Sequence, residues 1–120
     1  MSANYKAVGN TLEYTNTGSA IASGAVVIVG ALVGIAATDI AATTGVGTVQ
    51  IEGVFEVPCN SADVISVGQK LVWDASASEF GDANPPAAGD NAGGVVAVTA
   101  AGTGVALVEV KLLPGSGATA

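Results

Sequence analysis

The sequence contains no histidine and no arginine, two side chains that enzymes often use to transfer protons and to bind anionic groups. The remaining reactive groups are one thiol, three lysines and ten carboxylates. Few residues are therefore available to form a catalytic pair of a nucleophile and a base. Neither Lys70 nor Lys111 follows a serine in an S-x-x-K arrangement. We expect a protein that is not an enzyme, and a structural role is the leading class.

A single cysteine excludes an internal disulfide and, without histidine, provides no zinc-binding pattern. We expect Cys59 to act as a small hydrophobic residue next to Pro58. The carboxylates Glu79, Asp82 and Asp90 share one segment, but their spacing matches no compact calcium-binding loop, which favours a solvated acidic loop. The glycine pairs complete no nucleotide-binding motif. We therefore expect no metal and no cofactor.

Cations are scarce, and the net charge is −7 at pH 7. Nucleic acid phosphates would be repelled, so we expect no nucleic-acid partner. Aromatic residues make up 4% of the chain, whereas 17 glycines accompany many alanines and valines. Small and β-branched side chains of this kind favour strands that approach one another closely.

A long uncharged segment, from Ala20 to Thr38, is the one feature that favours a membrane protein, because Gly30 and Gly34 have the G-x-x-x-G spacing of packed membrane helices. Glycines weaken a helix, and the valines from Val26 to Val29 favour a strand. The flanks lack a basic cluster and an aromatic belt. We expect no membrane partner, and the membrane protein stays the least favoured alternative. The N-terminus has no secretory-signal pattern, which predicts folding in the cytoplasm of the producing cell.

The periodicity is that of strands throughout, and it predicts an all-β fold: a compact antiparallel β-sandwich or a small β-barrel with short glycine-rich turns. We expect one domain over residues 1–113, with an N-terminal arm over about residues 1–18 and a flexible tail over residues 114–120. Ser61 to Val67 could form one short helical turn. The expected strands are Thr11–Tyr14, Ala25–Val29, Leu32–Ala37, Val46–Val57, Gln69–Asp74, Gly94–Thr99 and Val105–Leu113.

Three of these strands show informative patterns. Val46 to Val57 alternates apolar and polar residues until Gly53 interrupts the count, as a bulge or bend would. Ala25 to Val29 is continuously apolar, which predicts a strand that is covered on both faces, by a second layer or by another subunit. In the last strand, Glu109 and Lys111 are expected to face solvent.

A long segment from Ala75 to Ala92 is rich in Gly, Pro, Asp and Asn, and it predicts a surface loop of the kind that contacts partners. Trp73 and Asp74 stand just before it. Trp73 fits either a core position or an anchor in an interface, and Asp74 fits the start of a turn.

Four sequence segments, taken in their order along the chain, resemble a family of small tailed-phage proteins that decorate the head, the capsid cement or decoration proteins. These segments are SGAVVIVGALVGIAATDIA, GTVQIEGVFEVP, VGQKLVWDA and GVVAVTAAGTGVALVEVKL. The match extends nearly end to end. It is weakest from Lys6 to Asn16 and in the length of the Ser76 to Asn91 segment.

The resemblance implies a structural virion protein that binds the outer surface of the expanded capsid and bridges subunits of the major capsid protein. It implies a homo-oligomer, with a trimer favoured and a dimer possible, and neither catalysis nor a cofactor. A host-attachment module on the tail or fibre stays open as an alternative. The residues expected at the capsid or subunit interface are Tyr5, Lys6, Tyr14, Trp73, Phe80, Asp82, Asn84, Pro85 and Pro86.

Overall fold

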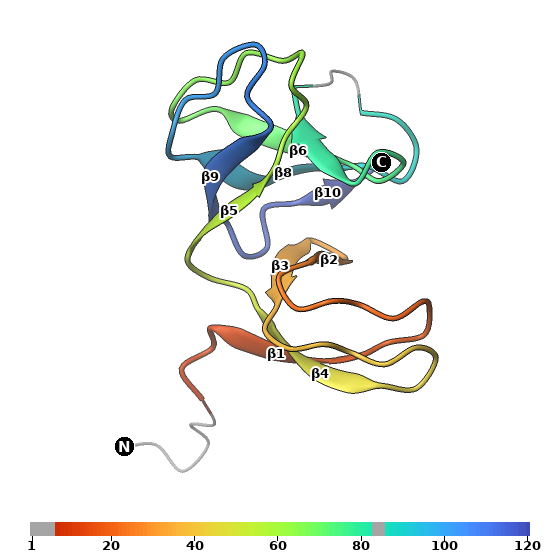
Figure 1. Ribbon diagram of the computed structural model, residues 1–120. Coiled ribbons are helices and arrows are strands. Elements are labelled where there is room, and N and C mark those ends of the chain that lie inside the picture. The colour runs from red at the N-terminus through yellow and green to blue at the C-terminus, as the bar shows by residue number, and fades with distance from the viewer. Residues whose placement is uncertain (1–6, 83–85) are drawn as a thin grey trace.

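The computed structural model describes residues 7–82 and 86–120, which form ten strands and no helix (Figure 1). The strands make two antiparallel sheets that pack on each other, and neither sheet is a closed barrel. The predicted all-β class is confirmed, and of the two predicted architectures the structure has the packed sheets.

The smaller sheet has four strands in the order β1-β4-β3-β2. Tight turning at Gly30, with φ 59°, joins β2 to β3. Pairing between β3 and β4 covers only two positions, at Ile35 and Ala36. Figure 1 shows β2 and β3 lying between the β1–β4 pair and the larger sheet. The strands are β1 (Thr11–Thr15), β2 (Val26–Val29), β3 (Leu32–Ala36) and β4 (Val46–Gln50).

The larger sheet has the order β5-β9-β8-β6-β7, and the short strand β10 also pairs with β8. Its two edges approach each other, because Cys59 forms a single parallel bridge with Phe80 and the Asn60 N–H donates to the Phe80 carbonyl at 2.8 Å. The strands are β5 (Val54–Pro58), β6 (Lys70–Asp74), β7 (Glu79–Gly81), β8 (Asn91–Ala97), β9 (Leu107–Leu112) and β10 (Ala118–Thr119).

Strand β2 is shared between two hydrophobic cores. Val26 and Ile28 pack against the core between the two sheets, whereas Val27 and Val29 belong to or border the core under β4. The prediction of a strand covered on both faces is therefore confirmed, and the cover is a second layer of the same chain. The core between the sheets consists of Val33, Ile35, Val57, Cys59, Ile65, Leu71, Phe80, Val95, Ala97, Ala101, Val108, Val110 and Leu112.

The predicted continuous strand from Val46 to Val57 is wrong, because the chain changes sheets within it. Val46 to Gln50 forms β4 of the smaller sheet, and Val54 to Pro58 forms β5 of the larger one. Gly53 lies between them with φ 119°, a conformation that other residues rarely adopt. The predicted bend at Gly53 therefore exists, and it links the two sheets.

The predicted helical turn from Ser61 to Val67 is also wrong. Ile65 forms an isolated bridge with Ala101 and is buried in the core. The Asn60 side chain, and not that of Ser61, accepts from a backbone N–H, that of Ala62, at 2.9 Å. A helix this short has few hydrogen bonds to offset its nucleation cost, so pairing with the neighbouring loop prevails.

The Ala75 to Ala92 segment is not a single surface loop. It contains β7 and the first residues of β8, and Phe80 within it is buried. Asp74 accepts hydrogen bonds from Ser76 and Ala77, so it initiates the turn between β6 and β7 as predicted. Two further segments differ from expectation: part of the expected arm forms β1, and part of the expected tail forms β10.

Candidate docking surface on the larger sheet

The face of the larger sheet opposite to the one buried in the core carries a row of four side chains. Cross-strand partners in an antiparallel pair share a face. Lys70 is opposite Val96, Val96 is opposite Lys111, and Lys111 is opposite Val54. The lysines of β6 and β9 therefore lie on the same face, separated by the one strand β8. We call this surface, formed by β5, β9 and β8 with Lys70 of β6, the outer face.

A second row lies two residues further along the strands. Glu56 is directly opposite Glu109, and the Val98 N–H donates to the Glu109 carbonyl at 2.9 Å, which continues the β8–β9 register. The Glu109 N–H donates to the Thr99 hydroxyl at 3.1 Å, so a side chain replaces the backbone acceptor where β8 ends. Like charges directly opposite are destabilising unless a cation lies nearby.

Several apolar side chains on the outer face remain open to solvent. Val54 is 53% exposed, Leu107 is 50% exposed and Val98 is 36% exposed. Leu107 pairs with Pro58, which is also exposed. Exposed valines and leucines that gather on one sheet face are typical of a surface that binds another protein.

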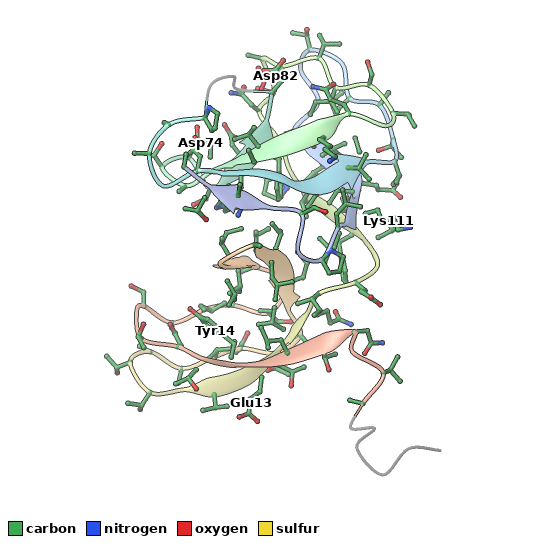
Figure 2. The ribbon with its side chains drawn as sticks, turned by 180° about the vertical axis from the view of Figure 1, so that it is seen from behind. Glu13, Tyr14, Asp74, Asp82 and Lys111 are labelled. Carbon is green, nitrogen blue, oxygen red and sulfur yellow. The ribbon has the colours of Figure 1, made fainter. Side chains whose placement is uncertain are left out.

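The outward face of the smaller sheet has a different composition. Thr11, Thr15 and Thr48 lie there beside Glu13, which Figure 2 shows pointing away from the protein. Threonine and glutamate side chains hydrogen-bond to water readily. Val46, opposite Thr15, is 57% exposed on this face, but the outer face of the larger sheet gathers three such apolar side chains and is the stronger candidate for protein contact.

Two carboxylates meet near the β7 edge of the larger sheet. The Asp82 N–H donates to Asp63 Oδ2 at 3.0 Å. Partial desolvation, a hydrogen bond between the two side chains and the negative charge of Asp63 together raise the pKa of Asp82. Among residues 7–82 and 86–120, no group of three or more metal-ligating side chains gathers in one place.

The other carboxylates of this segment do not join them in one cluster. Asp90 is buried, and its two oxygens accept from the N–H groups of Ala75 and Ala87, each at 3.1 Å. The predicted solvated acidic loop is therefore wrong for Asp90, because this carboxylate closes the loops on either side of β7.

Cys59 is a free cysteine and is only 2% exposed. Its Sγ lies 3.4 Å from the Val105 carbonyl, to which the thiol donates. Desolvation raises the pKa of the thiol, and the negative charges of Glu79 and Asp63 raise it further. A nucleophilic cysteine needs a lowered pKa, so this environment fits the predicted role as a small core residue.

The structure disperses the predicted interface residues. Tyr5, Lys6, Asn84 and Pro85 lie outside the described residues. Tyr14 packs against the core of the smaller sheet, and Asp82 is exposed at the far end of the molecule (Figure 2). Pro86 is partly exposed. Asp82 and Pro86 line one groove of about 290 Å³ next to Lys70, whereas Tyr14 lies in the smaller sheet.

Two aromatic residues of that set contribute to the main core. Phe80 is 1% exposed, and its ring meets the ring of Trp73 edge to face, with centroids 4.9 Å apart. Trp73 is partly buried against the same core. Its remaining surface borders a groove of about 240 Å³ whose other lining residues are Gly24, Ala25, Val26, Pro58 and Ser78. Of the two roles open for Trp73, the packing fits the core position.

The outer face was not found from the sequence, apart from the solvent-facing side chains of Glu109 and Lys111. Alternation within β9 shows which residues point outward, but only the strand register shows that Lys111 neighbours Val96 and Val54. That register depends on the long connections between β5, β8 and β9, which carry no local signal.

Comparison with known proteins gives one match. A model of a protein family described as phage cement protein matches residues 6–112. No curated protein and no solved structure matches the chain. No helix among the described residues is long and apolar enough to cross a membrane.

Proposed function

The chain belongs to the phage cement protein family, and from that membership we propose that it decorates the outside of the expanded capsid and stabilises it by bridging major capsid protein subunits. The match over residues 6–112 carries this proposal, because it includes nine of the ten strands and ends before β10. Membership gives the chain a structural role at the phage capsid. The outer location and the bridging belong to the proposal.

Binding that favours the assembled lattice over free subunits is sufficient for such a role. A protein that binds only one state stabilises that state by mass action, in proportion to its occupancy. Many copies attached across local symmetry axes would strengthen modest single contacts. The packed, helix-free architecture of the described residues suits a rigid bridge, since much of the backbone hydrogen bonding lies within the two sheets.

The proposed partners are the major capsid protein and further copies of this chain, as a trimer or a dimer. The proposed capsid contacts are the exposed Asp82 and the partly exposed Pro86, together with four residues outside the described part of the chain, Tyr5, Lys6, Asn84 and Pro85. Tyr14 is a weaker candidate, because its packing against the smaller core means that replacement by alanine would also affect folding.

Quantitative mass spectrometry of purified virions tests the proposal by comparing copies of this chain with copies of the major capsid protein. We expect hundreds of copies in simple proportion to the capsid protein. A handful of copies would favour the alternative of a host-attachment module on the tail or fibre, and absence would reject any virion role.

Stabilisation needs a second measurement on shells that lack the chain. Such shells are expected to release DNA at a lower temperature than wild-type shells, and purified protein added back should restore the difference. Shells that are equally stable with and without the protein would contradict the cement role even if the copy number were high.

A further inference from the structure

We infer that the outer face of the larger sheet docks against the same face of a second copy, through a two-fold axis that runs along the rows of side chains. The axis lies between the row of Lys111 and the row of Glu109. This inference deepens the homo-oligomer part of the proposed function, and of the two oligomers proposed it selects the dimer.

The two rows carry opposite charges at matching positions. Lys111 and Glu109 stand two residues apart on β9, both exposed and both on the outer face. A two-fold axis between the rows exchanges them, so Lys111 faces the partner's Glu109 and Glu109 faces the partner's Lys111. Each dimer then contains two such pairs, because a contact across a two-fold axis occurs twice.

The same operation relieves a strain within one chain. Glu56 and Glu109 are direct cross-strand neighbours on β5 and β9, which places two negative charges side by side. The partner's lysine would lie above Glu109 and supply the cation that this pair lacks on its own row. A chain with a net charge of −7 would otherwise repel its copy, so opposite charges at the contact are needed for association.

Apolar residues match across the same axis. Val96 lies in the Lys111 row and Val98 continues the Glu109 row, so Val96 faces the partner's Val98. Burial of the exposed Val98 against the partner's Val96 would supply the non-directional part of the binding, whereas Val54 would face the partner's Glu56. A different two-fold axis, along β9, would place Lys111 on the partner's Lys111, so the charges select one arrangement.

The geometry leaves the rest of the molecule free. Val33 and Ile35 of the smaller sheet belong to the core on the other face of the larger sheet, so they do not cover the outer face. Aligned packing of two sheets face to face is a common arrangement in β proteins.

Analytical ultracentrifugation of the purified full chain, without capsids, tests the inference. The wild-type protein is expected to sediment as a dimer in equilibrium with monomer. Lys111→Glu and Glu109→Lys, each alone, should raise the dimer dissociation constant at least about tenfold, because like charges then face each other in both pairs. The double variant K111E/E109K should restore the dissociation constant to nearly the wild-type value.

Glu13→Lys is the matched control, since it changes the net charge by the same amount as Glu109→Lys but lies on the outward face of the smaller sheet. The dimer dissociation constant of this variant should be no higher than that of the wild type. Circular dichroism establishes that each variant is folded before it is compared.

Three results would overturn the inference: a wild-type protein that stays monomeric or forms a trimer, a Lys111→Glu variant that dimerises normally, or a folded double variant that does not recover. None of these results bears on the number of copies in the virion. Failure of the dimer is therefore distinguishable from failure of the capsid role.

Discussion

Val33 of β3 lies directly against Gly94 of β8, with no space for a side chain on the glycine. A methyl group at Gly94 would overlap Val33 Cγ2 and would lie 2.9 Å from Asn91 Oδ1. This is the point where the two sheets touch backbone to side chain. The missing Cβ of Gly94 therefore sets the distance between the sheets.

Replacing Gly94 by alanine should lower the free energy of unfolding by about 1–3 kcal/mol, the usual cost of overpacking a core. Val33 cannot move aside easily, because it is 2% exposed within the core between the sheets. Urea denaturation followed by tryptophan fluorescence measures the change, since Trp73 packs against that core.

Gly102→Ala is the control, because nothing lies within 4 Å of a Cβ at Gly102. It should change the stability little. In the double variant Gly94→Ala with Val33→Ala, the smaller side chain at position 33 makes room for the new methyl group. The double variant should therefore lose less free energy of unfolding than the two single variants lose in total. Strict additivity would show that the contact between these residues is not the cause.

Much of the architecture was predictable because the local patterns and the final packing agree. Alternation in Leu107 to Leu112 corresponds to a half-exposed strand, and the continuous apolar run in Val26 to Val29 corresponds to a strand with a hydrophobic core on each face. The change of sheet at Gly53 was visible only as an interruption, since a glycine marks a bulge and a sheet change in the same way.

Other features depended on contacts that are distant in the chain. Phe80 stood in a segment rich in turn residues, and its pairing with Trp73 determines that it is part of a strand. The candidate surface depends on the register that places Lys70, Val96 and Lys111 side by side, which no local pattern contains. Pairing between strands that are distant in the chain is the property of a β-sheet that is hardest to predict from its sequence.

Desolvation of Asp82, together with its contact with Asp63, should make stability depend on pH. The raised pKa of Asp82 means that the folded protein holds this proton more tightly than the unfolded chain does. Stability is therefore expected to fall as the pH rises from the ordinary aspartate pKa of 3.8 through the raised value. Asp63→Asn should remove the repulsion and give a higher melting temperature than wild type at pH 7.

The difference between Asp63→Asn and wild type should shrink as the pH falls through the raised pKa of Asp82, because a protonated Asp82 no longer carries the charge that Asp63 repels. Thermal unfolding between pH 2.5 and about 7 measures it. Glu13→Gln removes one negative charge from an exposed site and serves as the comparison. An equal gain from Glu13→Gln at pH 7 would assign the effect to net charge and not to this pair.

Cys59 should react slowly with thiol reagents in the folded protein. Burial and a raised pKa both reduce the amount of accessible thiolate. Labelling with iodoacetamide at pH 8 should be much slower in buffer than in urea, and mass spectrometry gives both rates. Equal rates would show that the edges of the larger sheet, joined by the bridge between Cys59 and Phe80, open frequently.

The C-terminal segment connects the two sheets at a second point. The Gly117 N–H donates to the Ala31 carbonyl at 3.1 Å, in the β2–β3 turn. Asn91 of β8 reaches the same turn, since its Nδ2 donates to the Gly30 carbonyl at 3.1 Å. Thr119 then pairs with Asn91 as part of β10. Gly117 and Thr119 lie beyond the matched family segment, which ends at residue 112, whereas Asn91 and the β2–β3 turn lie within it.

Gly117→Ala should release this connection. A Cβ at Gly117 would lie 2.5 Å from Asn91 Oδ1 and 2.9 Å from the Ala31 carbonyl, so the segment must move away. Loss of its hydrogen bond to Ala31 is expected to lower the free energy of unfolding by about 0.5–1.5 kcal/mol. Hydrogen exchange should accelerate at Gly117 and in β10, while β9 stays protected. Ser116→Ala, an exposed neighbour, should change neither quantity. If Gly117→Ala left β10 as protected as in the wild type, the segment would be held by its pairing with β8 alone, and the contact with the β2–β3 turn would contribute nothing to joining the sheets.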